Sequence, residues 1–375
     1  MMKVSVVIPA YNAVKTLGQT LQSAIGQVVS VFDDDYPRGG PWPDGPALVE
    51  RLCRAMGHRG ETLLLGPHLN QAKNPLEILV VDDGSKDGTA DYARALAATA
   101  PRGIEIRVLA KENGGPASAR NAGITAATGD LIAFLDADDL WIPCKMSRQI
   151  AAFEASPECL MAYSDSLYFR ETGIYSPPGL REDRRAGGDI FELLLVEGNI
   201  IPQLTVVARK QALVQIAADN GWDGPLDANP DVISSEDYGL WLDLAARGPA
   251  AYIPERLSWY RVMAGGLNLS HLERSHAASR SVMRRAISKP QAATVSRERI
   301  RERFAETWYE EGYEHMELGR PDAAARCFAR SLATHPTTAA AKGLLRTSWL
   351  FIPALRPPPM GVADRGEDFV SFLRG

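Results

Sequence analysis

The chain has 375 residues, a formal net charge of -5 and 23% charged residues. This length allows one large domain or a domain with an appendage, and the slightly acidic balance gives no reason to expect nucleic acid as a partner. The four cysteines show no CxxC pairing, which disfavours a zinc site or a disulfide framework and fits a reducing cytoplasm.

Membrane-spanning segments are not expected. No apolar run approaches the roughly 20 residues needed to cross a bilayer, and Met1, Met2 and Lys3 lead directly into an expected strand instead of a signal peptide. We therefore expect a cytoplasmic protein.

Alternating strands and helices are predicted over the first part of the chain. Apolar and β-branched runs predict strands, and apolar residues at helical spacing predict helices. The expected strands are 4–9, 77–81, 104–109 and 131–135, and the expected helices are 14–27, 89–100 and 115–128. Repeated strand–helix units predict a parallel, doubly wound sheet. Residues 28–74 interrupt the rhythm with glycine, proline and acidic clusters, and we interpret them as a surface insertion remote from the ligand edge.

The second part of the chain is less regular. Helices are expected at 143–155, 191–196, 210–218 and 237–247, extended segments at 160–169, 204–208 and 256–262, and a mobile loop at 177–188. From Arg284 onward the sequence becomes almost wholly helical. We divide the chain into residues 1–270 and a helical region at 271–375.

Three acids follow the expected strand 131–135: Asp136, Asp138 and Asp139. Like charges this close raise each other's pKa unless a cation lies among them. Hard oxygen ligands suit Mg²⁺ or Mn²⁺, whose coordination is typically completed by substrate phosphates. The alternative is that the acids cap the helix that begins near Pro143.

Two other strands also end in polar residues. Pro9, Tyr11 and Asn12 close the first strand and Asp83 the second, and the carboxyl ends of parallel strands meet at one ligand-binding edge. Tyr11 offers a ring for stacking on a nucleobase, and Asp83 an acceptor for the imide N–H of uracil or thymine. Turn formation and helix capping are the alternative roles of these residues.

Arg120 lies one turn into the expected helix 115–128. From there it could bind a nucleotide oxygen bidentately, or it could be a solvated surface arginine. Neither GxGxxG nor GxxxxGK[ST] follows any expected strand, so a metal ion is expected to hold the diphosphate.

The motifs VSVVIPAYN, EILVVDDGSKDGT, NGGPASARNAG and LDADDLW, followed by SEDYGLW at 235–241, occur in that order. In this order and character they resemble the family 2 glycosyltransferases over residues 4–268. The resemblance implies the GT-A fold, a Rossmann-like, mostly parallel α/β sheet with helices on both faces. It implies that Pro9, Tyr11 and Asp83 hold the nucleotide, that Asp136 of the DXD motif lies by the ribose, that Asp138 or Asp139 ligates the metal, and that Asp237 is the base.

Inverting glycosyl transfer requires a general base on the acceptor hydroxyl and a cation at the departing diphosphate. Asp237 suits the first role, although Ser234-x-x-Asp237 also resembles a capping box that opens a helix. We assign Glu236 and Arg261 to the substrate side with Asn12 and Arg120. Met263 stands where family members often carry a histidine, and we assign no role to His271.

The region 305–338 resembles a tetratricopeptide hairpin at Trp308, Gly312, Ala324, Phe328 and Pro336. Glu311 and His315 depart from that pattern. One repeat does not bury its own apolar face, so we expect it to pack on the catalytic domain, on a second copy or on a protein partner.

These observations predict an inverting, metal-dependent hexosyltransferase that moves a sugar from a UDP or dTDP donor to a hydroxyl acceptor, such as a growing surface glycan or a lipid-linked glycan. Peripheral association with the inner face of a membrane is a further expectation. The alternative is a non-catalytic nucleotide-sugar-binding or scaffold protein that uses the fold and the helical tail for assembly. A nucleotidyltransferase would need a GxGxR-type loop after the first strand, and Pro9-Ala10-Tyr11-Asn12 has none.

Overall fold

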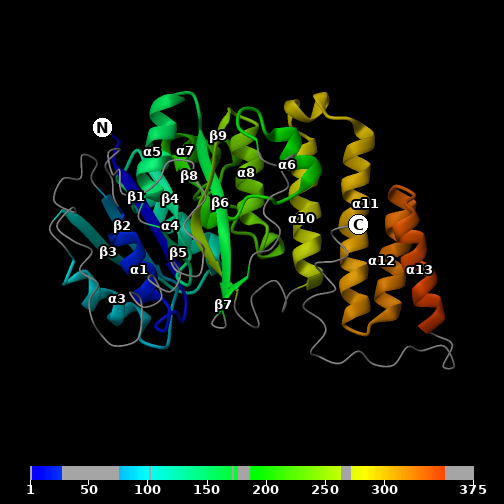
Figure 1. Ribbon diagram of the computed structural model, residues 1–375, viewed down its shortest axis with the longest axis horizontal. Helices are drawn as coiled ribbons and strands as arrows, with labels where there is room; N and C mark the ends of the chain where they lie inside the picture. Colours follow the sequence, from blue (N-terminus) through cyan, green and yellow to red (C-terminus); the bar gives the residue numbers. More distant parts are fainter. Residues whose placement is uncertain are drawn as a thin grey trace.

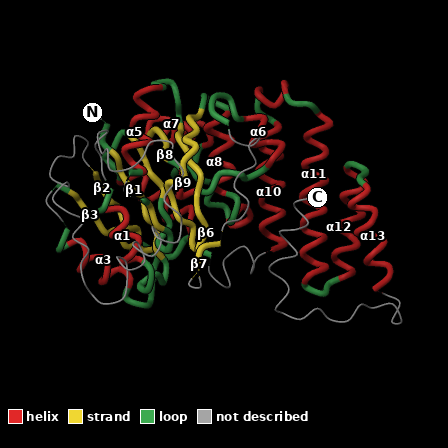
Figure 2. Tube along the Cα trace, viewed as in Figure 1, coloured by secondary structure: helices red, strands yellow, loops and turns green. Residues whose placement is uncertain are grey.

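The computed structural model describes residues 2–27, 76–100, 103–142, 144–170, 173–175, 186–262 and 272–350. Its centre is a nine-stranded sheet in the order β3-β2-β1-β4-β8-β6-β9-β5, with β7 paired to β6 (Figures 1 and 2). The strands are β1 Val4–Ala10, β2 Leu76–Asp82, β3 Ile104–Ala110, β4 Leu131–Phe134, β5 Leu140–Trp141, β6 Met161–Arg170, β7 Gly173–Tyr175, β8 Val207–Arg209 and β9 Ala250–Arg261.

The helices that accompany this sheet follow the predicted alternation. They are α1 Leu17–Ile25, α3 Thr89–Ala97, α4 Gly115–Ala126, α5 Lys145–Ala155, α6 Phe191–Glu197, α7 Lys210–Asn220 and α8 Glu236–Ala245. Strands β1, β2, β3 and β4 are mutually parallel, which confirms the predicted α/β sheet. Beyond β4 the sheet is mixed, because β8 runs antiparallel to both β4 and β6.

Strand β1 shows why the sheet needs helices on both faces. Val4, Val6 and Ile8 point into one hydrophobic core, and Val7 points into the other, as the two-residue period of a strand requires. Helices α1 and α5 cover the first core, whereas α4, α6 and α8 cover the second. A strand buried on both faces is mostly apolar, as β1 and β2 are. The buried polar residues Ser5 of β1 and Glu77 of β2 form a hydrogen bond, in which the Ser5 hydroxyl donates to Glu77 Oε2.

Some local predictions were wrong or fall outside the described part of the chain. The expected extended segment 204–208 divides into a 3₁₀ turn, Gln203–Thr205, and the short strand β8. The helical region begins with α10, Leu272–Ile287, earlier than Arg284. The expected insertion 28–74 and most of the expected loop 177–188 lie outside the described residues.

The helical region stands beyond the edge of the sheet as a row of α10, α11 Arg297–Glu317, α12 Pro321–Thr334 and α13 Thr338–Leu350 (Figure 1). Helix α10 shares the second hydrophobic core through Ala278, Val282 and Met283. Helices α11 and α12 form the predicted hairpin. At its centre the Phe328 ring contacts Gly312 of α11 so closely that a Cβ there would lie 2.8 Å from a ring atom. The tetratricopeptide assignment of this hairpin stays a prediction.

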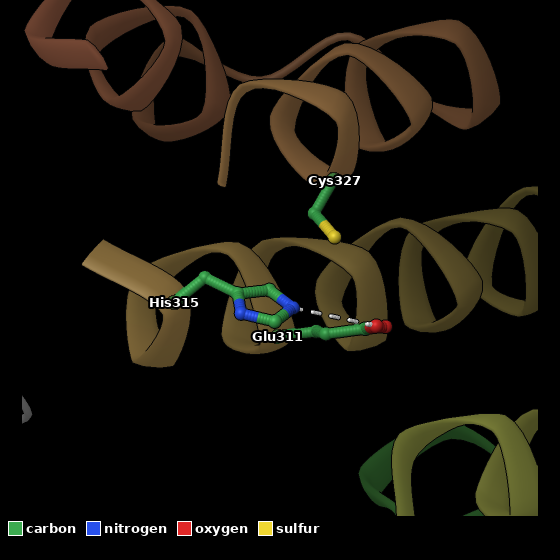
Figure 3. Close-up of side chains that lie close together, drawn as sticks. All are labelled: Glu311, His315 and Cys327. Carbon is green, nitrogen blue, oxygen red and sulfur yellow. Dashed lines mark ion pairs between the residues drawn. The ribbon is translucent and has the colours of Figure 1, made fainter. Parts of the chain in front are cut away.

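The residues that depart from the tetratricopeptide pattern are polar groups buried between α10, α11 and α12. Glu311, His315 and Cys327 lie close together (Figure 3). Glu311 is already neutralised by Arg280 of α10, with Nη2 2.7 Å from Oε2, and the Arg280 guanidinium lies 3.5 Å from the centre of the Trp308 ring. We therefore interpret this cluster as the contact that holds the hairpin on α10 within the helical region. The expected packing of the hairpin on the catalytic domain, on a second copy or on a partner stays a prediction.

Within the residues that the structure describes, no helix is sufficiently long and apolar to cross a membrane.

Candidate functional site

Strands β1, β2 and β3 end in register. Ala10 pairs with Asp82, and Asp82 pairs with Ala110. The residues that follow them therefore emerge at one edge of the sheet, where parallel α/β folds bind their ligands. This edge presents Tyr11, Asp83 and Lys111.

Asp83 is fixed by the start of α4. One carboxylate oxygen accepts from the Gly114 N–H at 3.0 Å and the other from the Gly115 N–H at 2.8 Å, and Lys111 Nζ lies 2.7 Å from Oδ1. A helix N-terminus favours a negative charge through its free N–H groups and its dipole. The carboxylate that is predicted to recognise the base is thus held in one orientation.

Tyr11 and Asn12 have different surroundings. Tyr11 is 52% exposed, so its ring is available for stacking on a planar ligand. Asn12 has a left-handed backbone, φ 50°. Its side-chain oxygen accepts from the Lys86 N–H at 2.9 Å, and its N–H donates to Ser85 Oγ. Asn12 therefore joins the loops after β1 and β2, as the turn alternative expects, whereas Pro9 lies within β1 opposite Val81.

The acid cluster lies where β4 ends and β5 begins. Burial and the nearby Asp136 raise the pKa of Asp138 to about 6. The pKa of the buried Asp139 is also raised, by burial and by both neighbouring acids. Carboxyl groups with these raised pKa values fit a divalent cation, because a cation among them removes the repulsion. Asp138 and Asp139 both stay candidate ligands, and the charge of Arg261 lowers the pKa of each.

Arg261 closes this part of the site. The pairing of β5 with β9 brings it beside the acids, where its backbone N–H donates to Asp139 Oδ1 at 2.7 Å and its Nε donates to the Asp138 carbonyl at 2.7 Å. Its Nη2 donates to Gln19 Oε1 at 2.7 Å, and its guanidinium lies 4.5 Å from the centre of the Phe169 ring. Arg261 therefore orients the acid cluster.

Arg120 bridges the two acidic halves of the site. Its Nη2 lies 2.6 Å from Asp136 Oδ1, and its Nη1 lies 2.9 Å from Glu236 Oε1. Burial alone would lower the pKa of Arg120, but the charges of Asp136 and Glu236 raise it above its ordinary value. Arg120 is 6% exposed, so the alternative of a solvated surface arginine is wrong. Both of its terminal nitrogens are held by protein carboxylates.

Asp237 lies in the first turn of α8, beside Glu236. Burial and then the charge of Glu236 raise its pKa to about 7, although hydrogen bonds and Arg120 lower it. The capping-box alternative is wrong, because the N-cap is Ser235, which makes no side-chain capping bond. Ser234 has a positive φ of 75°, and its buried hydroxyl has no hydrogen-bond partner among the residues that the structure describes. The position and pKa of Asp237 suit proton transfer near neutral pH.

Three polar residues of this region are missing from the sequence-based site. Lys111 directly follows β3, so the rule that singles out strand ends would have found it. Gln19 and Asn199, the partners of Arg261 and Asp237, lie far from them in sequence. No local pattern marks either residue.

Residues 68–195 match the model of the family described as Glycosyl transferase family 2. An uncharacterized glycosyltransferase from Nostoc sp. is 43% identical over 212 residues, 54% of this chain and 60% of the relative. This chain spans 31% and 30% of two uncharacterized Rickettsia relatives.

Relatives with more specific names match as well. The succinoglycan biosynthesis protein ExoU of Rhizobium meliloti is 29% identical, covering 78% of this chain and 85% of the relative. The Escherichia coli UDP-Glc:alpha-D-GlcNAc-diphosphoundecaprenol beta-1,3-glucosyltransferase WfaP is 29% identical, covering 53% and 71%.

Among solved structures, S. aureus TarS 1-349 in complex with UDP-GlcNAc superposes with a TM-score of 0.54 at 15% identity, covering 92% of this chain and 89% of that one. The mannosyltransferase PcManGT from Pyrobaculum calidifontis, in complex with GDP-Man and Mn2+, gives 0.51 at 17% identity, covering 93% and 80%. These neighbours share the fold. Together, the matched family model and the named relatives show that this chain is similar to family 2 glycosyltransferases over part of its length.

Proposed function

We propose that this protein is an inverting, metal-dependent glycosyltransferase that uses a UDP- or dTDP-sugar donor and a hydroxyl acceptor of a growing or lipid-linked glycan. The observation that carries the proposal is the position of Arg120. It joins Asp136, on the side assigned to the donor, to Glu236, next to the candidate base. The buried Arg120 side chain thereby links the donor side of the proposed site to the side that carries the candidate base.

In this proposal the residues at the strand ends bind the donor. Tyr11 stacks on the base, and Asp83, held by Lys111 and the start of α4, accepts from its imide N–H. Asp138 and Asp139 are the residues that would hold Mn²⁺ or Mg²⁺. When bound, such an ion neutralises the departing diphosphate.

Asp237 performs the proton transfer in this proposal. Its carboxylate takes the proton of the acceptor hydroxyl while the acceptor oxygen bonds to the anomeric carbon from the face opposite the leaving group. The bond from that carbon to the diphosphate oxygen breaks, and its electron pair leaves with the diphosphate. A single displacement of this kind inverts the anomeric centre, and it needs an ionised base near the working pH.

Direct assay of donor cleavage tests the proposal. The purified protein is incubated with UDP-, dTDP- and GDP-sugars in Mn²⁺, in Mg²⁺ and in chelator, and the released nucleotide is measured. We expect slow cleavage of a uridine or thymidine donor that depends on the cation and that an acceptor glycan accelerates. Tight binding of a nucleotide sugar without cleavage under any condition would favour the scaffold alternative.

A further inference from the structure

Asn199 is the side chain that contacts both oxygens of Asp237. It lies in the connection between α6 and the 3₁₀ turn Gln203–Thr205. Its Nδ2 lies 3.2 Å from Oδ1 and 3.2 Å from Oδ2 of Asp237. A donor shared between both oxygens fixes the plane of the carboxylate, because rotation about the Cβ–Cγ bond would break the shared contact.

The helix that carries Asp237 also holds the connection on both sides of Asn199. The Tyr238 hydroxyl donates to the Leu194 carbonyl at 2.8 Å, and Trp241 Nε1 donates to the Ile201 carbonyl at 3.2 Å. Both rings are buried, so these hydrogen bonds are shielded from water. The backbone on both sides of Asn199 is therefore held against α8, while Asn199 itself is exposed.

Helix α11 supports the same connection from the outside. Gly198, directly before Asn199, has a φ of 85°, which favours glycine. A Cβ at this residue would lie 2.6 Å from Nη2 of Arg303. The guanidinium thus lies against the backbone at Gly198, and its Nη1 is held by Glu306 and Glu310. Arg303 therefore links α11 to the backbone of Gly198, the residue directly before Asn199.

We propose that Asn199 is a positioning residue for Asp237, and that Arg303 of α11 holds the Asn199 connection in place. This inference rests on the proposed function, because it assigns Asn199 to the base of that reaction. Asn199 acts through Asp237 and takes no part in bond making itself.

The charges around Asp237 determine what loss of Asn199 does. Burial and the charge of Glu236 raise the pKa of Asp237, whereas the hydrogen bonds from Asn199 and the Tyr238 N–H and the charge of Arg120 lower it. Removal of the amide takes away the largest of the contributions that lower the pKa and leaves the Tyr238 N–H and Arg120 to oppose burial and Glu236. The pKa of Asp237 then rises, and the base becomes ionised only at higher pH.

The test is the pH dependence of donor turnover for Asn199→Ala and Asn199→Asp. A hydrogen bond to a charged group corresponds to about one pKa unit or somewhat more. We expect the acidic limb of the Asn199→Ala profile to move up by about one pH unit, and that of Asn199→Asp to move further, because it adds a negative charge. The dissociation constant of the donor should stay within about twofold of wild type.

Arg303 and Arg299 give a matched pair of variants on α11. Arg299 pairs with Glu192 at the surface, and exposed pairs of this kind contribute little to stability. Arg303→Ala should shift the acidic limb in the same direction as Asn199→Ala, by a smaller amount, whereas Arg299→Ala should reproduce the wild-type profile.

Asp237→Asn in the same assay separates the two claims. Near-normal turnover of Asp237→Asn overturns the base assignment in the proposed function. If Asp237→Asn is inactive but Asn199→Ala and Asn199→Asp keep the wild-type profile, only the positioning role is wrong. Equal loss of turnover at every pH, with no shift of the limb, indicates a purely structural Asn199 and also overturns the inference.

Discussion

At the scale of single residues, Asp237 is a carboxyl group whose surroundings favour its protonated form. Burial and Glu236 raise its pKa to about 7, about three units above that of an ordinary aspartate. The folded protein therefore keeps this proton up to about pH 7, while the unfolded chain releases it near pH 4. Because the folded state binds more protons in that interval, stability contributed by the protonated form is lost as the pH rises through 7.

We expect Asp237→Asn to remove this loss of stability. The melting temperature of the variant minus that of wild type should be more positive at pH 8 than at pH 5, because asparagine carries no charge to bury. Differential scanning fluorimetry at both pH values measures the difference. The control is Asp91→Asn in α3, because the Asp91 side chain is 87% exposed. A difference that does not change with pH would contradict the raised pKa.

The acid cluster gives a second prediction at this scale. Binding of UDP or dTDP should depend on Mn²⁺ or Mg²⁺, because burial and the neighbouring acids raise the pKa values of Asp138 and Asp139, and a cation among these carboxyl groups would offset their repulsion. Calorimetry with wild type and with the double variant Asp138→Asn, Asp139→Asn measures this dependence. Unchanged nucleotide affinity in chelator, or in the double variant, would exclude the metal role.

At the scale of elements, the bridge between α4 and α8 holds the site together. Arg120 is buried between Asp136 and Glu236, and removal of one member of such a buried pair leaves uncompensated charge at a cost of about 3–5 kcal/mol. We expect Arg120→Met to lower the free energy of unfolding by about this amount. Adding Glu236→Gln should restore part of it, because one of the two orphaned charges is removed.

Urea unfolding of both variants checks this bridge. Arg94→Ala is the control, because Arg94 forms an exposed pair with Asp91, which should contribute less than about 1 kcal/mol. If Arg120→Met were as stable as Arg94→Ala, the bridge would not hold α4 and α8 together.

The elements also show how far the sequence could lead. Continuous apolar runs predicted β1 to β4, and strand ends located Tyr11, Asp83 and the acid cluster, because one topological rule brings those ends together. The partners of Arg120 could not be predicted, since Arg120 and Glu236 are 116 residues apart and meet only when α8 packs on the sheet. The antiparallel position of β8 between β4 and β6 could not be predicted either, because tertiary packing determines it.

At the scale of the whole molecule, the helical region contacts the part of the chain that carries the sheet through both α10 and α11. Arg285 of α10 pairs with Asp227, and Arg303 of α11 lies against Gly198. The division at residue 270 stays a prediction about domains, because α10 shares its hydrophobic core with the sheet. Glu311, which departs from the tetratricopeptide pattern, pairs with Arg280 and holds α11 on α10 within the helical region.

Truncation after Ser296, which removes α11 and everything beyond it, tests the coupling. We expect donor binding to persist, since Asp83, Asp138 and Asp139 lie on the sheet. Turnover should fall at acidic pH, because Arg303 no longer supports Asn199, and solubility or oligomeric state should change, because α10 loses its cover. Calorimetry, turnover and light scattering on both proteins measure these effects. Identical turnover, oligomeric state and solubility would show that the helical region is independent of the site.

The proposed inverting glycosyl transfer depends most directly on Asp237, its candidate base. The measurement is donor turnover by Asp237→Asn and wild type near pH 8, under saturating nucleotide sugar and Mn²⁺, with the donor dissociation constant determined in parallel. We expect an unchanged dissociation constant and a turnover lower by about 10²-fold or more, as for the loss of a general base. Turnover within a few-fold of wild type at an unchanged dissociation constant would contradict the account.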